Sequence, residues 1–174
     1  MSDSNTFDSF NYFIEPLGKH HDRASFSCGV ETLDRYLKKQ AAQDASKRVA
    51  APFVLIEKNS SKVVGYYTLC ATSIKIDELP IEIAKKLPKY SDVPATLLGR
   101  LAVEQNFRNK GLGETLVMDA LYRSLLSKIA TMAVVVSAKD DKARSFYEHY
   151  NFIRFSDYPF RLFLPMTTIA EMFE

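Results

Sequence analysis

The middle of the chain combines a strand-like run of apolar residues with a helix-like repeat. A largely apolar run from Leu97 to Val103 predicts a strand, and the polar residues after it predict a loop. From Leu112 onward, apolar residues recur every three or four positions, which is the period of an amphipathic helix. This stripe consists of Leu112, Leu116, Val117, Ala120, Leu121, Leu125 and Ile129. Residues 97–129 are therefore expected to fold as strand, loop and helix.

The segments before this unit predict a strand, a helix and a hairpin. The expected elements are a strand over 12–14, a helix over 30–46, strands over 52–57 and 63–76 joined by a turn at 59–62, and a short helix over 82–86. Gly65 interrupts the second hairpin strand and can mark a bulge. Residues 87–94 are expected to form a loop over the functional site of the protein.

The segments after the central helix alternate again between strand and helix patterns. A buried strand is expected over 133–136, followed by a short helix with Asp140 or Asp141 as N-cap. Asn151 stands where a left-handed residue would end that helix. Strands over 152–155 and 160–164, joined around 157–159, and a helical turn over 167–173 complete the chain. The mixture predicts an α+β (mixed α/β) fold, with a flexible N-terminus over 1–9 and a single domain over 10–174.

Composition limits the class of protein. The 174 residues are 47% hydrophobic, which is enough for a sizeable core. No apolar stretch approaches the roughly 20 residues needed to cross a bilayer, and the N-terminus does not resemble a signal peptide. Cys28 and Cys70 are too few for a disulfide framework. We therefore expect a cytoplasmic protein that does not act at a membrane.

Two polar features allow more than one interpretation. His20, His21 and Asp22 are consistent with a metal site, but no third ligand of matching spacing follows, so an exposed loop is favoured and no metal is expected. The net charge is only +2, yet basic residues gather in three groups, which form either a solvated surface or a track for phosphates. The groups are Lys38, Lys39, Lys47 and Arg48; Lys85, Lys86 and Lys89; and Lys139, Lys142 and Arg144.

The loop between the central strand and helix is the main candidate for binding chemistry. Arg108, Asn109, Lys110, Gly111, Leu112 and Gly113 place two cations and two glycines at the start of a helix. Helix-start N–H groups lack internal partners and attract anions, and glycine lets a phosphate approach the backbone. The residues alone equally allow a simple tight turn. Their spacing matches neither the P-loop nor the dinucleotide fingerprint.

The pattern Arg-x-x-Gly-x-Gly after an apolar strand resembles the pyrophosphate-binding motif of the GNAT N-acetyltransferases. The resemblance implies the GNAT fold, a central twisted and mostly antiparallel sheet flanked by helices. It also implies acetyl-CoA as cosubstrate. The pyrophosphate would lie on Arg108, Asn109, Lys110, Gly111, Leu112 and Gly113, and the pantetheine arm would pair with the backbone of Leu101, Ala102 and Val103.

A longer set of segments resembles the GNAT toxins of bacterial type II toxin–antitoxin modules. The segments are CGVETLDRYLKKQAAQD, VGYYTL, LPKYSDVPATLLGRLAV, SFYEHYNF and RLFLPM, within residues 26–166. The resemblance implies acetylation of the α-amino group of aminoacyl-tRNA, which blocks translation. It implies a homodimer, a ribbon-helix-helix antitoxin, and operator DNA bound through that antitoxin. It also makes Tyr147 the general acid, although a tyrosine on an apolar helix face is otherwise more typical of a core.

Two other functions remain open on the sequence. One is a GNAT enzyme that acetylates a protein amine or a small-molecule amine. The other is a non-catalytic, acyl-CoA-binding regulatory subunit. The chain also departs from the toxin pattern in one place, since the helix of Tyr147 ends in Asn151-Phe152 where Gly-Phe is common. Asn tolerates the same left-handed backbone, so the geometry is expected to be kept.

Overall fold

Seven strands in residues 11–174 form a sheet in the order β1-β2-β3-β4-β5-β7-β6. The structure is a computed structural model that describes these residues, so the predicted flexible N-terminus over 1–9 lies outside them. β4 and β5 pair in parallel. β1–β2, β2–β3, β5–β7 and β6–β7 pair antiparallel. The sheet and its flanking helices confirm the predicted α+β fold.

The chain divides into two compact units, and two strands contribute to both. Among the described residues, unit 1 contains residues 11–70 and 100–120, and unit 2 contains residues 71–99 and 121–174. β3 (Val63–Lys75) and β4 (Asp92–Val103) each cross from one unit into the other, as does helix α4 (Leu112–Leu126).

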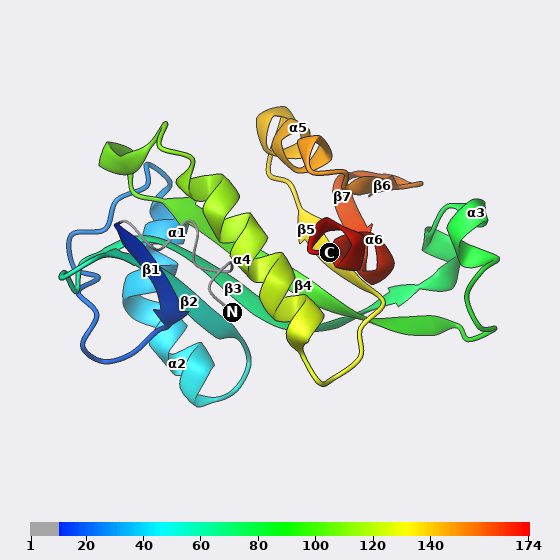
Figure 1. Ribbon diagram of the computed structural model, residues 1–174, viewed down its shortest axis with the longest axis horizontal. Coiled ribbons are helices and arrows are strands. Elements are labelled where there is room, and N and C mark those ends of the chain that lie inside the picture. Colours follow the sequence, from blue (N-terminus) through cyan, green and yellow to red (C-terminus); the bar gives the residue numbers. More distant parts are fainter. Residues whose placement is uncertain (1–10) are drawn as a thin grey trace. The chain divides into compact units, whose positions relative to one another are not determined.

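Unit 1 packs helices on both faces of its strands (Figure 1). It contains β1 (Tyr12–Pro16), β2 (Ala51–Glu57), α1 (Glu31–Arg35), a π-helical turn η2 (Tyr36–Gln40), α2 (Ala41–Ser46) and a 3₁₀ turn η4 (Gln105–Phe107). α4 lies against one face of the strands, where the Tyr67 hydroxyl and the Asp119 carboxylate are 2.6 Å apart. The α1–η2–α2 segment covers the other face. The predicted helix over 30–46 is therefore present, with a π turn that its apolar spacing does not signal.

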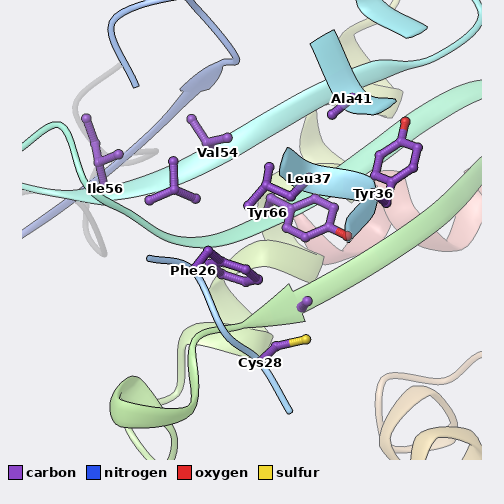
Figure 2. Packing of buried hydrophobic residues seen from close by; sticks show 10 residues of the cluster. Phe26, Cys28, Tyr36, Leu37, Ala41, Val54, Ile56 and Tyr66 are labelled. Atoms are coloured by element: carbon purple, nitrogen blue, oxygen red, sulfur yellow. The ribbon is translucent and has the colours of Figure 1, made fainter. Parts of the chain in front are cut away.

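The core under this segment combines aromatic and aliphatic side chains. Figure 2 shows the Tyr66 ring between those of Phe26 and Tyr36, with Leu37 beside them. Tyr36 and Tyr66 are stacked, with ring centroids 6.2 Å apart. The Tyr66 hydroxyl donates to the Leu33 carbonyl at 2.7 Å, so the buried ring carries a satisfied polar end.

Unit 2 forms around the remaining strands. It contains a 3₁₀ turn η3 (Ile76–Glu78), α3 (Ile81–Ala84), β5 (Ala133–Ser137), α5 (Asp141–His149), β6 (Ile153–Phe155), β7 (Tyr158–Pro165) and α6 (Met166–Met172). Ile74, Val93, Val135, Phe155 and Phe163 form the centre of its core. The apolar run over 133–136 is buried as predicted.

Several predicted boundaries need correction. α4 ends at Leu126, and Ile129 is 79% exposed. The Ser127 N–H donates to the Ser124 carbonyl at 3.3 Å and the Ser127 hydroxyl accepts the Ile129 N–H at 3.2 Å, so local hydrogen bonds replace those of the helix before Ile129. β4 begins at Asp92, so residues 92–94 are strand and not loop. β7 begins at Tyr158, which leaves a tighter turn than predicted.

The predicted irregularity at Gly65 is confirmed. In β2 and β3, Leu55 pairs with Gly65 whereas Ile56 pairs with Val63, so Val64 is the extra residue of a bulge. Gly65 is also closely packed, since a Cβ there would lie 3.2 Å from the Leu116 side chain and 3.3 Å from the Ala102 carbonyl oxygen. The glycine therefore allows α4 to approach the strand closely.

Candidate functional site

The loop after β4 starts from a buried acid. Glu104 is 3% exposed, and its backbone N–H donates to the Val64 carbonyl at 2.8 Å. Its carboxylate accepts the Asn106 N–H at 2.6 Å and so caps η4. These two bonds fix the direction in which the chain leaves β4. Glu104 could not be predicted as a site residue, because a lone acid after an apolar strand carries no distinctive pattern.

The backbone of residues 109–111 has the alternating conformation of an anion-binding loop. Asn109 and Gly111 have positive φ angles of 64° and 76°, and Lys110 between them does not. Such alternation turns successive N–H groups toward one concave surface. A Cβ placed on Gly111 would meet nothing within 4 Å, so the space beside its backbone is open. Gly113 lies inside α4 without a positive φ, so of the two glycines only Gly111 uses the left-handed conformation.

α4 begins directly after this turn. The Gly111 carbonyl accepts the Thr115 N–H at 3.1 Å and the Thr115 hydroxyl at 3.0 Å, which closes the first helical turn. The N–H groups of a first turn have no partner within the helix, and the helix dipole favours negative charge there. Residues 108–113 thus form a turn and a helix start with open space beside Gly111, and pyrophosphate binding there remains a prediction.

Arg108 contacts a segment that lies about 80 residues earlier in the chain. Its guanidinium donates to the Cys28 backbone carbonyl. Next to it, the Gln105 N–H donates to the Ser27 carbonyl at 2.8 Å. Gly29 has φ +90°, and a Cβ there would lie 2.8 Å from Arg108 Nη2. The Arg108 side chain therefore holds residues 27–29 against the loop, and a direct contact from it to phosphate remains a prediction.

The end of β4 extends beyond its pairing with β5. The register with β5 covers Thr96–Leu98, and within residues 11–174 β5 pairs with no later residue of β4. Ala102 is buried in the core of unit 1, whereas Leu101 and Val103 are half-buried. The backbone of Leu101, Ala102 and Val103 therefore belongs to a stretch of β4 without a β5 partner.

Tyr147 lies in α5, in unit 2. Asp140 caps this helix by accepting the Ala143 N–H at 2.8 Å, which confirms one of the two predicted caps. The Tyr147 ring packs edge-on against Phe146 and Phe152, with centroids 5.3 Å apart in both pairs. Burial raises the pKa of Tyr147 to about 12, so its hydroxyl is protonated at neutral pH.

The helix of Tyr147 ends as predicted. Asn151 has φ 73°, the left-handed conformation, and its N–H donates to the Glu148 carbonyl at 3.0 Å. The Phe152 N–H donates to the Tyr147 carbonyl at 3.3 Å. Asn in place of the common Gly therefore keeps the C-terminal turn that positions Phe152 against the tyrosine ring.

The histidine cluster matches the expected exposed loop at His20 and Asp22 but not at His21. His21 is 5% exposed, and its Nε2 lies 2.6 Å from a Glu15 carboxylate oxygen. Ligand atoms of Glu15, His20 and His21 lie within 4.8 Å of one another, as a metal site would require. However, His21 Nδ1 accepts the Gly18 N–H at 2.8 Å, so Nε2 carries the proton and donates to Glu15. This bond holds the pKa of Glu15 below its ordinary value, and the cluster acts as a structural tie.

The curated relatives reported for this chain are named as toxins. A family model described as FR47-like protein matches residues 89–160. A probable toxin TacT of Sinorhizobium fredii is 28% identical over 169 residues, which cover 91% of this chain and 93% of the relative. A tRNA-acetylating toxin of Mycobacterium tuberculosis is 35% identical over 133 residues, which cover 75% of this chain and 78% of the relative. The chain belongs to the GNAT N-acetyltransferases, in the group of tRNA-acetylating toxins.

Solved structures agree with this family. AtaT complexed with acetyl-methionyl-tRNAfMet is 29% identical, with a TM-score of 0.86 and coverage of 94% of this chain and 99% of that chain. A Tyr-to-Phe mutant of AtaT bound to the C-terminus of the antitoxin AtaR and acetyl-CoA is 25% identical, with a TM-score of 0.78 and coverage of 93% and 98%. The AtaT–AtaR complex bound to DNA is 26% identical, with a TM-score of 0.75 and coverage of 93% and 99%. The resemblance seen in the sequence is confirmed, as is the expectation of an N-acetyltransferase.

Within residues 11–174, no helix has the length and apolar character needed to span a membrane.

Proposed function

We propose that this chain transfers the acetyl group of acetyl-CoA to the α-amino group of aminoacyl-tRNA, and thereby blocks translation as the toxin of a type II toxin–antitoxin system. The observation that carries this proposal is the 35% identity to a tRNA-acetylating toxin over three quarters of the chain. The likeness to AtaT complexed with acetyl-methionyl-tRNAfMet supports the same substrate class. An acetylated amine cannot attack another ester, so the aminoacyl group can no longer extend a peptide.

In this proposal, residues 101–113 hold the cosubstrate. The loop residues Arg108, Asn109, Lys110, Gly111, Leu112 and Gly113 bind the pyrophosphate through N–H groups and positive charge. The left-handed Gly111, with open space beside it, supports this role. The open edge of β4 over Leu101, Ala102 and Val103 supplies N–H and C=O groups to the pantetheine arm.

Tyr147 is the proposed general acid. A phenol whose pKa is raised to about 12 keeps its proton and can donate it to the sulfur as the thioester C–S bond breaks. The attacking nitrogen gives up a proton when the new C–N bond forms, and that proton restores the tyrosine. The net products are an N-acetyl amide and a free thiol, so the tyrosine is unchanged after each cycle.

The proposed partners follow the relatives. We propose a homodimer that is neutralised by a ribbon-helix-helix antitoxin and that reaches operator DNA through this antitoxin. The complexes of AtaT with AtaR, and of both with DNA, support an antitoxin and a DNA-bound assembly for this chain.

The decisive experiment is transfer of labelled acetyl from acetyl-CoA to total charged bacterial tRNA. We expect label on charged tRNA and none on deacylated tRNA. Tyr147→Phe is expected to lower turnover by about 10² or more, the scale of a lost general acid, while acetyl-CoA affinity stays nearly unchanged.

Two results would contradict the proposal at different points. If the protein binds acetyl-CoA but leaves charged tRNA unlabelled, the acetyl acceptor would instead be a protein amine or a small-molecule amine. Unchanged turnover of Tyr147→Phe would remove Tyr147 from the mechanism while leaving the substrate assignment intact.

A further inference from the structure

The loop that precedes α4 is exposed and has little support of its own. Gln105, Asn106 and residues 108–111 are exposed, and Phe107 between them is half-buried. The hydrogen bonds from Asn106 and Phe107 to Glu104 shape only the first turn of this loop. Holding an exposed backbone in one conformation costs entropy, which contacts with other parts of the protein must offset. The conformation of residues 109–111 therefore depends on what holds the loop from outside.

Residues 27–29, which we call the anchor, hold the loop from outside. Gln105 makes two of the contacts, since its backbone N–H donates to the Ser27 carbonyl at 2.8 Å and its side-chain amide donates to the Ser27 hydroxyl at 2.7 Å. The Arg108 guanidinium makes a third contact by donating to the Cys28 carbonyl. The anchor and the loop are about 80 residues apart in the sequence, so tertiary contacts fix the loop.

The anchor is itself fixed in the core of unit 1. Phe26 and Cys28, the neighbours of Ser27, are both buried, and Figure 2 shows them in the cluster that includes Tyr66. The Cys28 N–H also donates to the Asp34 carboxylate of α1 at 2.8 Å. Ser27 therefore presents its carbonyl and hydroxyl oxygens from a rigid position, and the loop that is bonded to them is restricted in the same way.

Gly29 allows the anchor and the loop to approach closely. Its φ of +90° is a conformation that glycine adopts readily, and a Cβ there would lie 2.8 Å from Arg108 Nη2. A larger residue at this position would push the guanidinium away from the Cys28 carbonyl. The backbone of the anchor therefore controls where the Arg108 side chain lies.

We infer that Ser27 and Gln105 are positioning residues for acetyl-CoA, because their hydrogen bond holds the loop over residues 105–111 in the conformation that binds the pyrophosphate. This inference rests on the proposed function, which places the pyrophosphate on residues 108–113. Ser27 and Gln105 are uncharged and lie outside that motif, so they act on the cosubstrate through the loop. A loop that is ordered before binding raises affinity, since less conformational entropy is lost when the ligand binds. Arg108 adds to this effect through the Cys28 carbonyl.

The first test is a double-mutant cycle on acetyl-CoA affinity, measured by calorimetric titration. Ser27→Ala removes the hydroxyl, and Gln105→Met removes the amide while keeping a side chain of similar length. Each variant should weaken acetyl-CoA binding about three- to tenfold, the usual effect of one hydrogen bond. The double variant should lose no more than either single variant, because both changes remove the same bond. Ser25→Ala, in an exposed serine two residues before Ser27, is the matched control and should bind normally.

Two further measurements separate positioning of the loop from a general structural effect. Acetyl-pantetheine carries the thioester arm without the pyrophosphate, so its affinity, followed by ligand-detected NMR, should be the same in Ser27→Ala, Gln105→Met and the unaltered protein. With charged tRNA as acceptor, KM for acetyl-CoA should rise in both variants, while kcat at saturating acetyl-CoA stays unchanged.

Gly29 provides a second, independent cycle. Gly29→Ala should weaken acetyl-CoA binding by displacing the Arg108 guanidinium from the Cys28 carbonyl. In a protein that already carries Arg108→Met, Gly29→Ala should cause no further loss of affinity. A further loss of the same size would show that Gly29 does not act through Arg108.

The possible outcomes distinguish this inference from the proposed function. Normal acetyl-CoA affinity in Ser27→Ala and Gln105→Met, additive losses in the double variant, or equal losses with acetyl-pantetheine would each overturn the positioning role alone. If the unaltered protein does not bind acetyl-CoA, the proposed function falls as well. If the expected losses occur but charged tRNA stays unlabelled, the positioning role is confirmed and only the proposed acetyl acceptor is wrong.

Discussion

At the scale of single residues, the surroundings decide what a side chain can do. Tyr147 and Tyr36 are both buried tyrosines with raised pKa values, but for different reasons. Burial beside Phe146 and Phe152 raises the pKa of Tyr147. Burial also raises the pKa of Tyr36, and its hydrogen bond to the Asp44 carboxylate raises that pKa further. The Tyr36 hydroxyl thus donates to the half-buried Asp44, which suits a structural role, and Tyr147 has the proton affinity that a general acid can use.

The raised pKa of Tyr147 predicts the shape of the pH profile. An α-amino group titrates near 8, so kcat/KM for charged tRNA should rise from pH 6 toward 8 as the amine loses its proton. Tyr147 stays protonated throughout, because its pKa is about 12, so no falling limb should follow up to pH 9. The measurement is initial acetyl transfer at each pH, corrected for ester hydrolysis. A decrease in kcat/KM below pH 9 that disappears in Tyr147→Phe would contradict the raised pKa of Tyr147.

At the scale of elements, the β4–loop–α4 unit joins several weak signals into one site. Glu104 fixes the exit from β4, the left-handed Asn109 and Gly111 turn the chain, and α4 begins at Leu112. None of these residues alone identifies a phosphate site. Their combination places N–H groups, a helix start and open space together, which is the arrangement that binds anions.

Gly111 allows this element to be tested without a steric clash inside the protein. Gly111→Glu should abolish measurable acetyl-CoA binding, because it places bulk and negative charge where the pyrophosphate is expected. Gly111→Ala is the matched control, since its Cβ meets no atom within 4 Å and it adds only the strain of a positive φ, about 1 kcal/mol. Calorimetric titration with acetyl-CoA measures both variants. If Gly111→Glu bound acetyl-CoA as tightly as the unaltered protein does, residues 108–113 would not be the pyrophosphate-binding loop.

At the scale of the whole molecule, charge is distributed differently from the three groups read in the sequence. Lys38, Lys39, Lys47 and Arg48 belong to unit 1, and the other two groups belong to unit 2. Arg144 in the third group pairs with Asp141 at 2.8 Å and lies over the Phe160 ring. This arginine therefore has a structural role, and a continuous phosphate track cannot be inferred from charge grouping alone.

Cofactor binding should be visible in the stability of the whole chain. A ligand that binds only the folded state at 100 times its Kd adds about 2.7 kcal/mol to the free energy of unfolding. For a chain of this size that corresponds to a rise in Tm of about 5–10 °C. Thermal unfolding followed by circular dichroism, with and without acetyl-CoA, measures the shift. The shift should be absent in Gly111→Glu, and its absence in the unaltered protein would contradict cofactor binding.

The sequence by itself determined the order of elements and the family. Period-two and period-3.6 patterns depend on which face of an element is buried, so β2, β3, β5 and α4 were predictable within a few residues. Helix caps are local as well, and Asp140 and Asn151 could be predicted from residue type. The motif over 108–113 and the quoted segments carried the resemblance that the comparisons confirm.

Tertiary structure alone decided which distant residues meet. The Arg108 guanidinium on the Cys28 carbonyl, the Glu15–His21 pair and the Arg100–Tyr36 stack each join elements that are separated by loops or by other elements. The π turn at Tyr36–Gln40 also left no trace in the apolar spacing. These features depend on strand pairing and on how side chains fill the space between elements, which local periodicity does not encode. For the same reason the sequence could predict a phosphate-binding loop, but it could not show the cavity beside the π turn.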